Sequence, residues 1–182
     1  MKKVSKPEPD LAKQGIIWDY WKPRRTHCWN MLVLAYREID GFEEADETEP
    51  FTLEYLWENF FIRLWLFRIC ILTLEKITFV KQDATHIIAD FDSCFIIENI
   101  NHLRALRDMT EHWDDYAADL GHGPATRIDN LDPWRTISKD RFEKGSLFLD
   151  RAISYDAAIR LLEASKMVST TFTDHYKSIK NP

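Results

Sequence analysis

Glycine is scarce in this chain and, together with proline, is absent from its middle. The 182 residues contain 5 glycines and 7 prolines, and none of them falls between residues 51 and 120. Both residue types interrupt helices, whereas the Leu, Ile, Phe, Glu and Ala that fill this stretch are compatible with them. The absence predicts long helices across the middle of the chain. A hydrophobic content of 45% with seven tryptophans excludes a disordered protein.

Cysteine is also scarce, and its spacing fits no metal site. The three cysteines, Cys28, Cys70 and Cys94, are too far apart for a zinc pattern. Their number is odd, and no signal peptide precedes them, so we expect a cytoplasmic protein with free thiols. No Walker, Gly-x-Ser-x-Gly or zinc motif is present, and we expect no metal and no cofactor.

The chain lacks an apolar run long enough for a membrane span. The most apolar segment, Phe60 to Leu74, contains Arg63 and Arg68. A bilayer helix needs about 20 apolar residues, and a central charge is costly there. We therefore interpret the segment as a buried helix of a soluble bundle, with no membrane contact.

An excess of positive charge is lacking as well. Residues 41–120 carry 6 basic and 17 acidic side chains, and the whole chain has a net charge of −6. Non-specific nucleic-acid binding depends on clustered Lys and Arg. Any nucleic-acid interface therefore requires a local basic patch, which the composition does not supply.

The pattern of breakers and caps predicts a single all-α domain over residues 1–182. We expect a bundle of four to five helices, a small β-hairpin between residues 135 and 154, and a loose N-terminal arm over residues 1–22, anchored by Trp18, Tyr20 and Trp21. A turn or kink near residues 99–101 is left open, because two asparagines there favour one. The expected helices are Arg25–Asp40, Thr52–Val80, a third starting at Asp83 or Thr85, Leu103–Leu120, and a last helix capped by Ser154 that ends near Tyr176.

The segment from Arg107 to Tyr116 concentrates side chains capable of chemistry. Arg107 and His112 bracket four residues, and Asp108 directly follows the arginine. On a helix, Asp108 and Tyr116 lie four residues to either side of His112, so an acid and a phenol flank the imidazole. Such an acid can fix the tautomer of the histidine. The apolar residues of the same helix, including Leu103, Leu106 and Met109, form an ordinary core face.

This segment resembles the Arg-polar-x-x-x-His signature of the HEPN family, small helical bundles that include metal-independent ribonucleases. The resemblance implies that Arg107 and His112 act at the RNA backbone in a cleft between two protomers. The toxin branch of that family often has a tyrosine two residues after the histidine, where this chain has Asp114. An RNA substrate, a second copy and a protein such as an antitoxin are the partners implied. The expected site is Arg107, Asp108 and His112 for catalysis, with Glu111, Tyr116 and Arg104 for binding.

One geometric condition accompanies this hypothesis. Arg107 and His112 are five residues apart, which is about 140° around a straight helix. They cannot reach one phosphate unless the helix breaks near Arg107 or a symmetric partner supplies half of the site. The hypothesis therefore requires a homodimer.

Three alternatives compete with catalysis. His112 can be an ordinary solvated histidine, and Arg107 can pair with Glu111 one turn on. A carboxylate-bridged metal site would use His86 and Asp90 together with Asp108 and His112, although the second Glu-x-x-His of such bundles is missing. A non-catalytic bundle would use its apolar helix, Phe60 to Leu74, to dimerise or to bind a partner.

Overall fold

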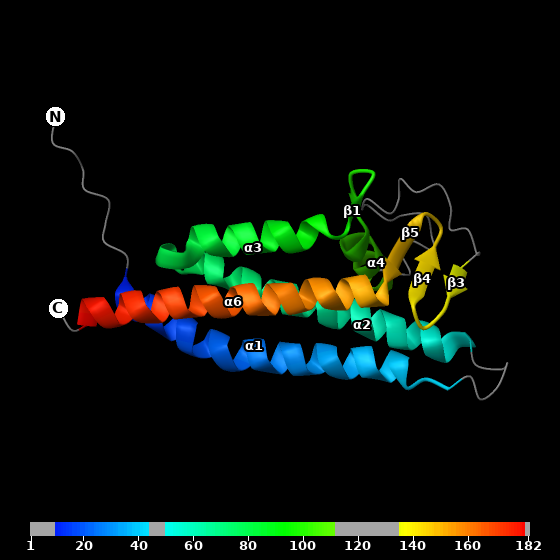
Figure 1. Ribbon diagram of the computed structural model, residues 1–182, viewed down its shortest axis with the longest axis horizontal. Helices are drawn as coiled ribbons and strands as arrows, with labels where there is room; N and C mark the ends of the chain where they lie inside the picture. The colour runs from blue at the N-terminus through cyan, green and yellow to red at the C-terminus, as the bar shows by residue number, and fades with distance from the viewer. Residues whose placement is uncertain (1–9, 44–49, 112–134, 181–182) are drawn as a thin grey trace.

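The protein is a bundle of long helices with a small sheet at one end (Figure 1). The computed structural model describes residues 10–43, 50–111 and 135–180. Four helices lie along the bundle: α1 (Leu11–Asp40), α2 (Pro50–Leu72), α3 (Lys81–Ser93) and α6 (Arg151–Lys180). The prediction of a mostly helical bundle is confirmed. Among the described residues, no helix is both long and apolar enough to cross a lipid bilayer.

Aromatic side chains fill the core between these helices. Trp21 of α1 donates from its indole Nε1 to the backbone oxygen of Cys70 in α2, at 3.0 Å. Trp57 of α2 donates to the backbone oxygen of Ser138 at 2.8 Å, which ties the bundle to the sheet. Both indoles are fully packed, so their apolar rings contribute burial while their N–H groups keep a partner. The largest fully buried side chains are Trp21, Trp57, Phe60, Phe61, Phe67, Phe142 and Phe172.

The first helix begins earlier than the sequence indicated. The expectation of a loose arm up to residue 22 is wrong from Leu11 onward, because α1 runs through that region and includes Pro23. Asp10 caps the helix by accepting a bond from the Lys13 backbone N–H at 3.1 Å. Trp18 and Trp21 are buried against the bundle, and this burial offsets the cost of a proline inside a helix.

The second helix ends earlier than expected. Its predicted end at Val80 is wrong, since α2 stops at Leu72 and two short 3-10 turns, Thr73–Lys76 and Thr78–Val80, lead into α3. Leu74, Ile77 and Val80 are buried in these turns. Their apolar character made the segment resemble a continuing helix.

The region left open near residue 100 contains a tight hairpin. Strand β1 (Ile96–Ile97) pairs with β2 (Ile100–Asn101), and Glu98 and Asn99 between them have φ angles of 51° and 67°. Two consecutive left-handed residues are typical of the hairpin turns that match strand twist. The turn separates α3 from α4 (His102–Glu111).

The predicted hairpin near residues 135–154 is present with one more strand. Strands β3 (Arg135–Ile137), β4 (Arg141–Lys144) and β5 (Leu147–Asp150) form an antiparallel sheet in that order. Gly145 takes a φ of 60° in the turn between β4 and β5, a conformation that glycine adopts without steric cost. Helix α6 follows at once, and Arg151 at its start bonds Asp40 at the end of α1 at 2.9 Å.

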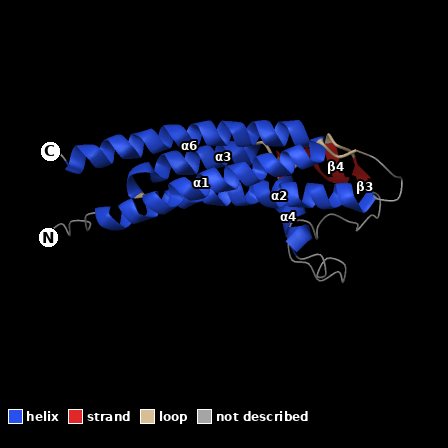
Figure 2. Cartoon of the chain, turned by 90° about the horizontal axis from the view of Figure 1, so that it is seen from below, coloured by secondary structure: helices blue, strands red, loops and turns tan. Residues whose placement is uncertain are grey.

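Helix α4 lies outside this parallel arrangement. It projects away from the long helices beside α2 (Figure 2). Its His102, Leu103, Ala105 and Leu106 are buried, whereas Arg104 is exposed. This side-chain pattern packs α4 against α2 and β5 and leaves its polar residues at the surface.

Candidate functional site

Arg107 lies at the edge of the surface that α4 presents to α2. Leu103 and Leu106 are buried, as the core stripe of the motif helix predicted. Arg107 follows directly on the boundary of that stripe, and its side chain is 19% exposed. Its position between core and solvent makes the guanidinium a contact group of the α2–α4 interface.

Trp65 of α2 receives this guanidinium on its ring. The Arg107 Cζ atom is 4.8 Å from the ring centroid, and the Arg68 Cζ atom is 4.7 Å from it. Arg68 in turn makes two hydrogen bonds to Asp92 of α3, one of them from Nε at 2.6 Å. The indole face attracts both cations, and the bidentate pair fixes one of them. The stack therefore holds the plane of the Arg107 side chain.

Two carboxylates share a single nitrogen of Arg107. Nη1 donates to Asp108 Oδ1 at 2.6 Å and to Glu111 Oε2 at 2.7 Å. Asp108 also lies 3.7 Å from Nε of Arg104. Within the described part of the chain, Nε of Arg107 is buried without a hydrogen-bond partner and Nη2 makes no ion pair. Two cations and two anions therefore balance on the outer side of α4.

The rest of the predicted site lies outside the described residues. Arg104, Arg107, Asp108 and Glu111 are brought together on α4, whereas His112 and Tyr116 belong to residues 112–134, whose structure is not described. The expected helix from Leu103 to Leu120 is accordingly described up to Glu111. The proposed meeting of Arg107 with His112 stays a prediction.

His102, at the start of α4, is a packed residue with a defined partner. It is buried, and its Nδ1 lies 3.1 Å from the backbone nitrogen and 3.2 Å from the backbone oxygen of Phe148 in β5. An unprotonated Nδ1 accepts from that N–H, whereas a protonated Nδ1 donates to that oxygen. Burial lowers the pKa of His102, against the opposing effects of the Phe148 backbone and the charge of Glu98.

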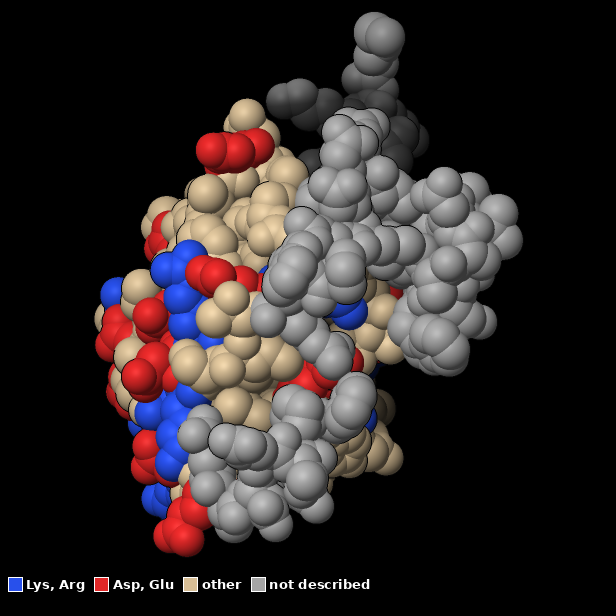
Figure 3. All heavy atoms as spheres, turned by 90° about the vertical axis from the view of Figure 1, so that its right-hand side faces the viewer, with Lys and Arg blue, Asp and Glu red and all other residues tan. Residues whose placement is uncertain are grey.

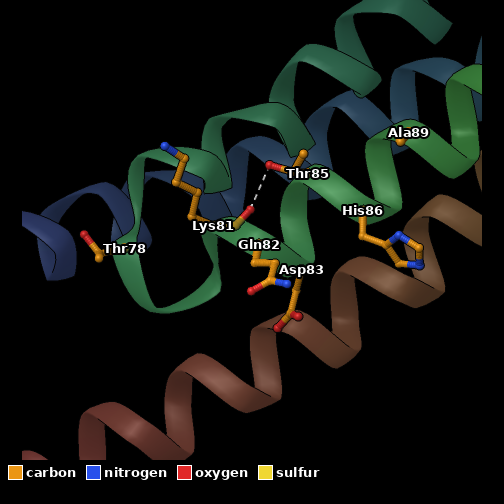
Figure 4. Close-up of a pocket in the computed structure, with 7 residues that line it drawn as sticks. All are labelled: Thr78, Lys81, Gln82, Asp83, Thr85, His86 and Ala89. Atoms are coloured by element: carbon orange, nitrogen blue, oxygen red, sulfur yellow. Dashed lines mark hydrogen bonds between the residues drawn. The ribbon is translucent and has the colours of Figure 1, made fainter.

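The metal alternative can be compared with the described part of α3. His86 Nε2 is 3.5 Å from Asp90 Oδ2, and both side chains are well exposed. Asp83 and His86 lie along one side of the helix in an open pocket of about 820 Å³ (Figure 4). Within the described residues, no three side chains of the metal-binding types come together. The remaining lining residues are Thr78, Lys81, Gln82, Thr85 and Ala89.

Charges of both signs alternate on the end of the molecule that carries the sheet. Among the described residues that this face shows, Lys and Arg side chains lie next to Asp and Glu along one edge (Figure 3). In strand β4, Arg141 Nε and Glu143 Oε1 form an ion pair at 2.5 Å. Mixed charge of this kind supplies no broad electrostatic footprint for RNA. A phosphate contact would have to be local.

Sequence reasoning missed Trp65, Arg68 and Asp92 as neighbours of the motif. The only local signal is the spacing of Trp65 and Arg68, which are one helical turn apart. Nothing in either segment indicates that α4 would place a second arginine on the same ring. Compared with protein-family models, with curated proteins and with solved structures, the chain matches none.

Proposed function

We propose that the protein is a HEPN-like, metal-independent endoribonuclease of a toxin or defence type that acts as a homodimer. The observation that supports this best is the fixed orientation of Arg107. Its guanidinium is stacked on Trp65 and paired with Asp108 and Glu111. Helix α4, which carries it, ends at Glu111, and His112 is the next residue in the sequence. A catalytic cation is most effective when its position is set before the substrate arrives.

In the proposed reaction His112 takes the proton of an RNA 2′-hydroxyl. The freed oxygen attacks the neighbouring phosphorus, the bond to the 5′-oxygen breaks as that oxygen takes up a proton from water, and a 2′,3′-cyclic phosphate and a 5′-hydroxyl form. Arg107 stabilises the negative charge that builds up on the phosphate oxygens. Arg104, which is exposed on the same helix, contacts a neighbouring phosphate. The second copy supplies the other half of the cleft.

Cleavage of single-stranded RNA in the presence of EDTA tests this proposal. His112→Ala is expected to lower the rate by about 100- to 10,000-fold, because proton transfer is lost. Arg107→Lys is expected to lower it by about 100-fold, since lysine keeps the charge but cannot give planar bidentate contacts. Loss of the 2′,3′-cyclic product in both variants is the expected readout.

Matched controls come from the exposed surface of the bundle. His86→Ala on α3 and Arg160→Lys on α6 change the same residue types away from α4 and should leave the rate unchanged. Because Arg107 packs on Trp65, circular dichroism and urea unfolding should accompany its variant. Equal rates in the wild type and both site variants, or no cleavage by any of them, would reject the ribonuclease.

A specific observation favours a second candidate, a non-catalytic module that self-associates. Several large apolar side chains of α2 face outward, although its inner side already fills the core. Tyr55, Ile62 and Ile69 follow each other at seven-residue intervals, and Leu66 lies between the last two. Tyr55 is 67% exposed, and Leu66 and Ile69 are each 38% exposed. A stripe with this period is the kind of surface that another helix covers.

A second copy of the chain is the occupant that this stripe fits best. Ile62 is its midpoint in the sequence, so a two-fold axis near Ile62 would pair α2 with itself in antiparallel orientation. Tyr55 of one copy would then lie on Ile69 of the other, and the reverse. Glu58 lies one turn before Ile62, so the uninterrupted apolar part of the stripe is Ile62, Leu66 and Ile69. This pairing would also bring two α4 helices to one assembly.

A further inference from the structure

Arg107 is already occupied by anions in the described structure. Its Nη1 donates to Asp108 and Glu111 at 2.6 and 2.7 Å, which are charge-assisted distances. A phosphate oxygen that approached the same nitrogen would have to compete with both carboxylates. With Arg104 close to Asp108, the four side chains also sum to no net charge. In this arrangement little electrostatic attraction for an RNA backbone remains.

The two carboxylates are held very differently. The Asp108 side chain is 18% exposed and faces both Arg104 and Arg107, whereas the Glu111 side chain is 43% exposed and has Arg107 alone as its ion-pair partner within the described residues. Exposed pairs spaced four residues apart on a helix are weak, because water screens them and two long side chains lose freedom. Glu111 is therefore the carboxylate that can leave without disturbing the rest.

Trp65 keeps Arg107 in place when Glu111 leaves. The ring contact at 4.8 Å does not involve Glu111. Arg68 packs on the same ring and is itself fixed by its hydrogen bond to Asp92. An anion that replaces Glu111 therefore meets a guanidinium whose plane is already set. The exchange needs a rotation of one glutamate side chain only.

We propose that Glu111 is an autoinhibitory anion that occupies the phosphodiester position on Arg107 and is displaced by the RNA backbone. This inference rests on the proposed function, since it assigns a regulation to the same arginine. It predicts that isolated weak anions do not displace Glu111 from Arg107, whereas a phosphodiester that Arg104 and Arg107 bind together does. Asp108 stays in place as the orienting partner of both arginines.

Glu111→Gln tests the contact without removing the side chain. Phenylglyoxal, which modifies free guanidinium groups, is applied to the wild type and the variant, and the rate at Arg107 is read by peptide mass spectrometry. We expect the rate to rise by about 1.5- to 5-fold, the factor that corresponds to an exposed ion pair. Arg104, in the same peptide region, should react at an unchanged rate and serves as the internal reference.

Binding of RNA is measured on the same proteins by fluorescence anisotropy, with a short fluorescein-labelled oligouridylate in EDTA. Glu111→Gln should tighten binding by a similar factor. Glu163→Gln removes the same charge from another exposed helix pair, at 2.7 Å from Lys166, and should change neither readout. Circular dichroism confirms that both variants fold.

These outcomes distinguish failure of the inhibitory contact from failure of the proposed ribonuclease function. An unchanged phenylglyoxal rate at Arg107 in Glu111→Gln overturns the inhibitory contact, whatever RNA does. A faster rate together with tighter RNA binding supports it. A faster rate with no binding or cleavage of RNA by any of the proteins overturns the proposed function and, with it, a phosphodiester as the displacing ligand.

Discussion

At the scale of single residues, His102 connects two elements through one nitrogen. Its Nδ1 is within hydrogen-bonding distance of both the backbone N–H and the backbone oxygen of Phe148, so α4 supplies a partner to the outer edge of β5. The bond from the Phe148 N–H forms only while Nδ1 carries no proton. Burial, which lowers the pKa of His102, keeps the imidazole neutral in the folded protein.

Acid should therefore weaken the fold through His102. The unfolded histidine titrates near its ordinary pKa of about 6.5, and the folded one titrates lower, so the unfolded chain binds the proton first. The contribution to stability is complete above about pH 6.5 and is lost as pH falls through the folded pKa. Urea unfolding between neutral and mildly acidic pH should show a slope of up to about 1.4 kcal/mol per pH unit from this group.

His102→Asn separates this effect from other titrations. The amide oxygen can accept from Phe148 but does not titrate in this range. The variant should lose the His102 part of the slope, whereas His86→Asn, a change at an exposed histidine, should retain it. Identical slopes in the wild type and His102→Asn would contradict the expectation.

Residue-level contacts differ in how far the sequence could predict them. His102 lies on the core stripe of a helix, so its burial followed from local periodicity. The pairing of Arg107 with Glu111 followed from i,i+4 spacing and is confirmed. The stack on Trp65 did not follow, because α2 and α4 are far apart in the sequence and a ring contact leaves no pattern in either segment.

At the scale of elements, the start of α6 shows how a cap is chosen. The prediction that Ser154 caps the last helix is wrong, because Ser154 is buried and lies inside the helix. Asp150, the last residue of β5, accepts instead from the Ile153 backbone N–H at 2.9 Å. The sequence Ser-x-Asp suggested a cap, but the strand that ends at Asp150 runs straight into the helix and leaves no connecting residues.

Asp150→Ala should accordingly destabilise the protein by about 1 kcal/mol, since one N–H of the first turn loses its partner. The free energy of urea unfolding measures the change. Asp156→Ala, which removes an exposed i,i+4 pair with Arg160, is the matched control and should cost less than about 0.5 kcal/mol. A larger effect at Asp156 than at Asp150 would show that the cap is not where the structure places it.

Element boundaries were predictable where glycine stands at an end and less so elsewhere. Helix α1 ends at Asp40, as expected, and the backbone N–H of Gly41 after it bonds back to Arg37. The start of α1 was hidden by Pro23, which usually ends a helix but here lies within one. The breakdown of α2 into 3-10 turns was hidden by continuous hydrophobicity, since both kinds of helix bury the same residue types.

At the scale of the whole molecule, α2 carries two apolar sides. Its inner side holds Trp57, Phe60 and Phe67 in the core, whereas Tyr55 and Ile69 face outward. The core of a single chain needs only the inner side. The outward stripe is the reason to expect a dimer.

The wild type should therefore be a dimer at micromolar concentration by light scattering. The double variant Leu66→Glu, Ile69→Glu should weaken the dimer by about 100-fold or more, because several like charges would face each other in the interface. Met167→Glu places a charge at another exposed apolar residue, on α6, and should not change the mass. A monomeric wild type would reject both the α2 interface and the two-protomer cleft.

Asp40 ends the first helix and Arg151 begins the last, and their side chains meet at 2.9 Å across 111 residues of sequence. During translation, α1 leaves the ribosome long before its partner exists. Until residues 151–180 have been made, the aromatic side chains of α1 that pack on α6, Trp18, Trp29 and Tyr36, lack these neighbours. Closing so long a loop is slow, and the exposed core surface of the unfinished chain invites aggregation in the meantime. Synthesis of α6 therefore ends the period in which the unfinished chain is prone to aggregate.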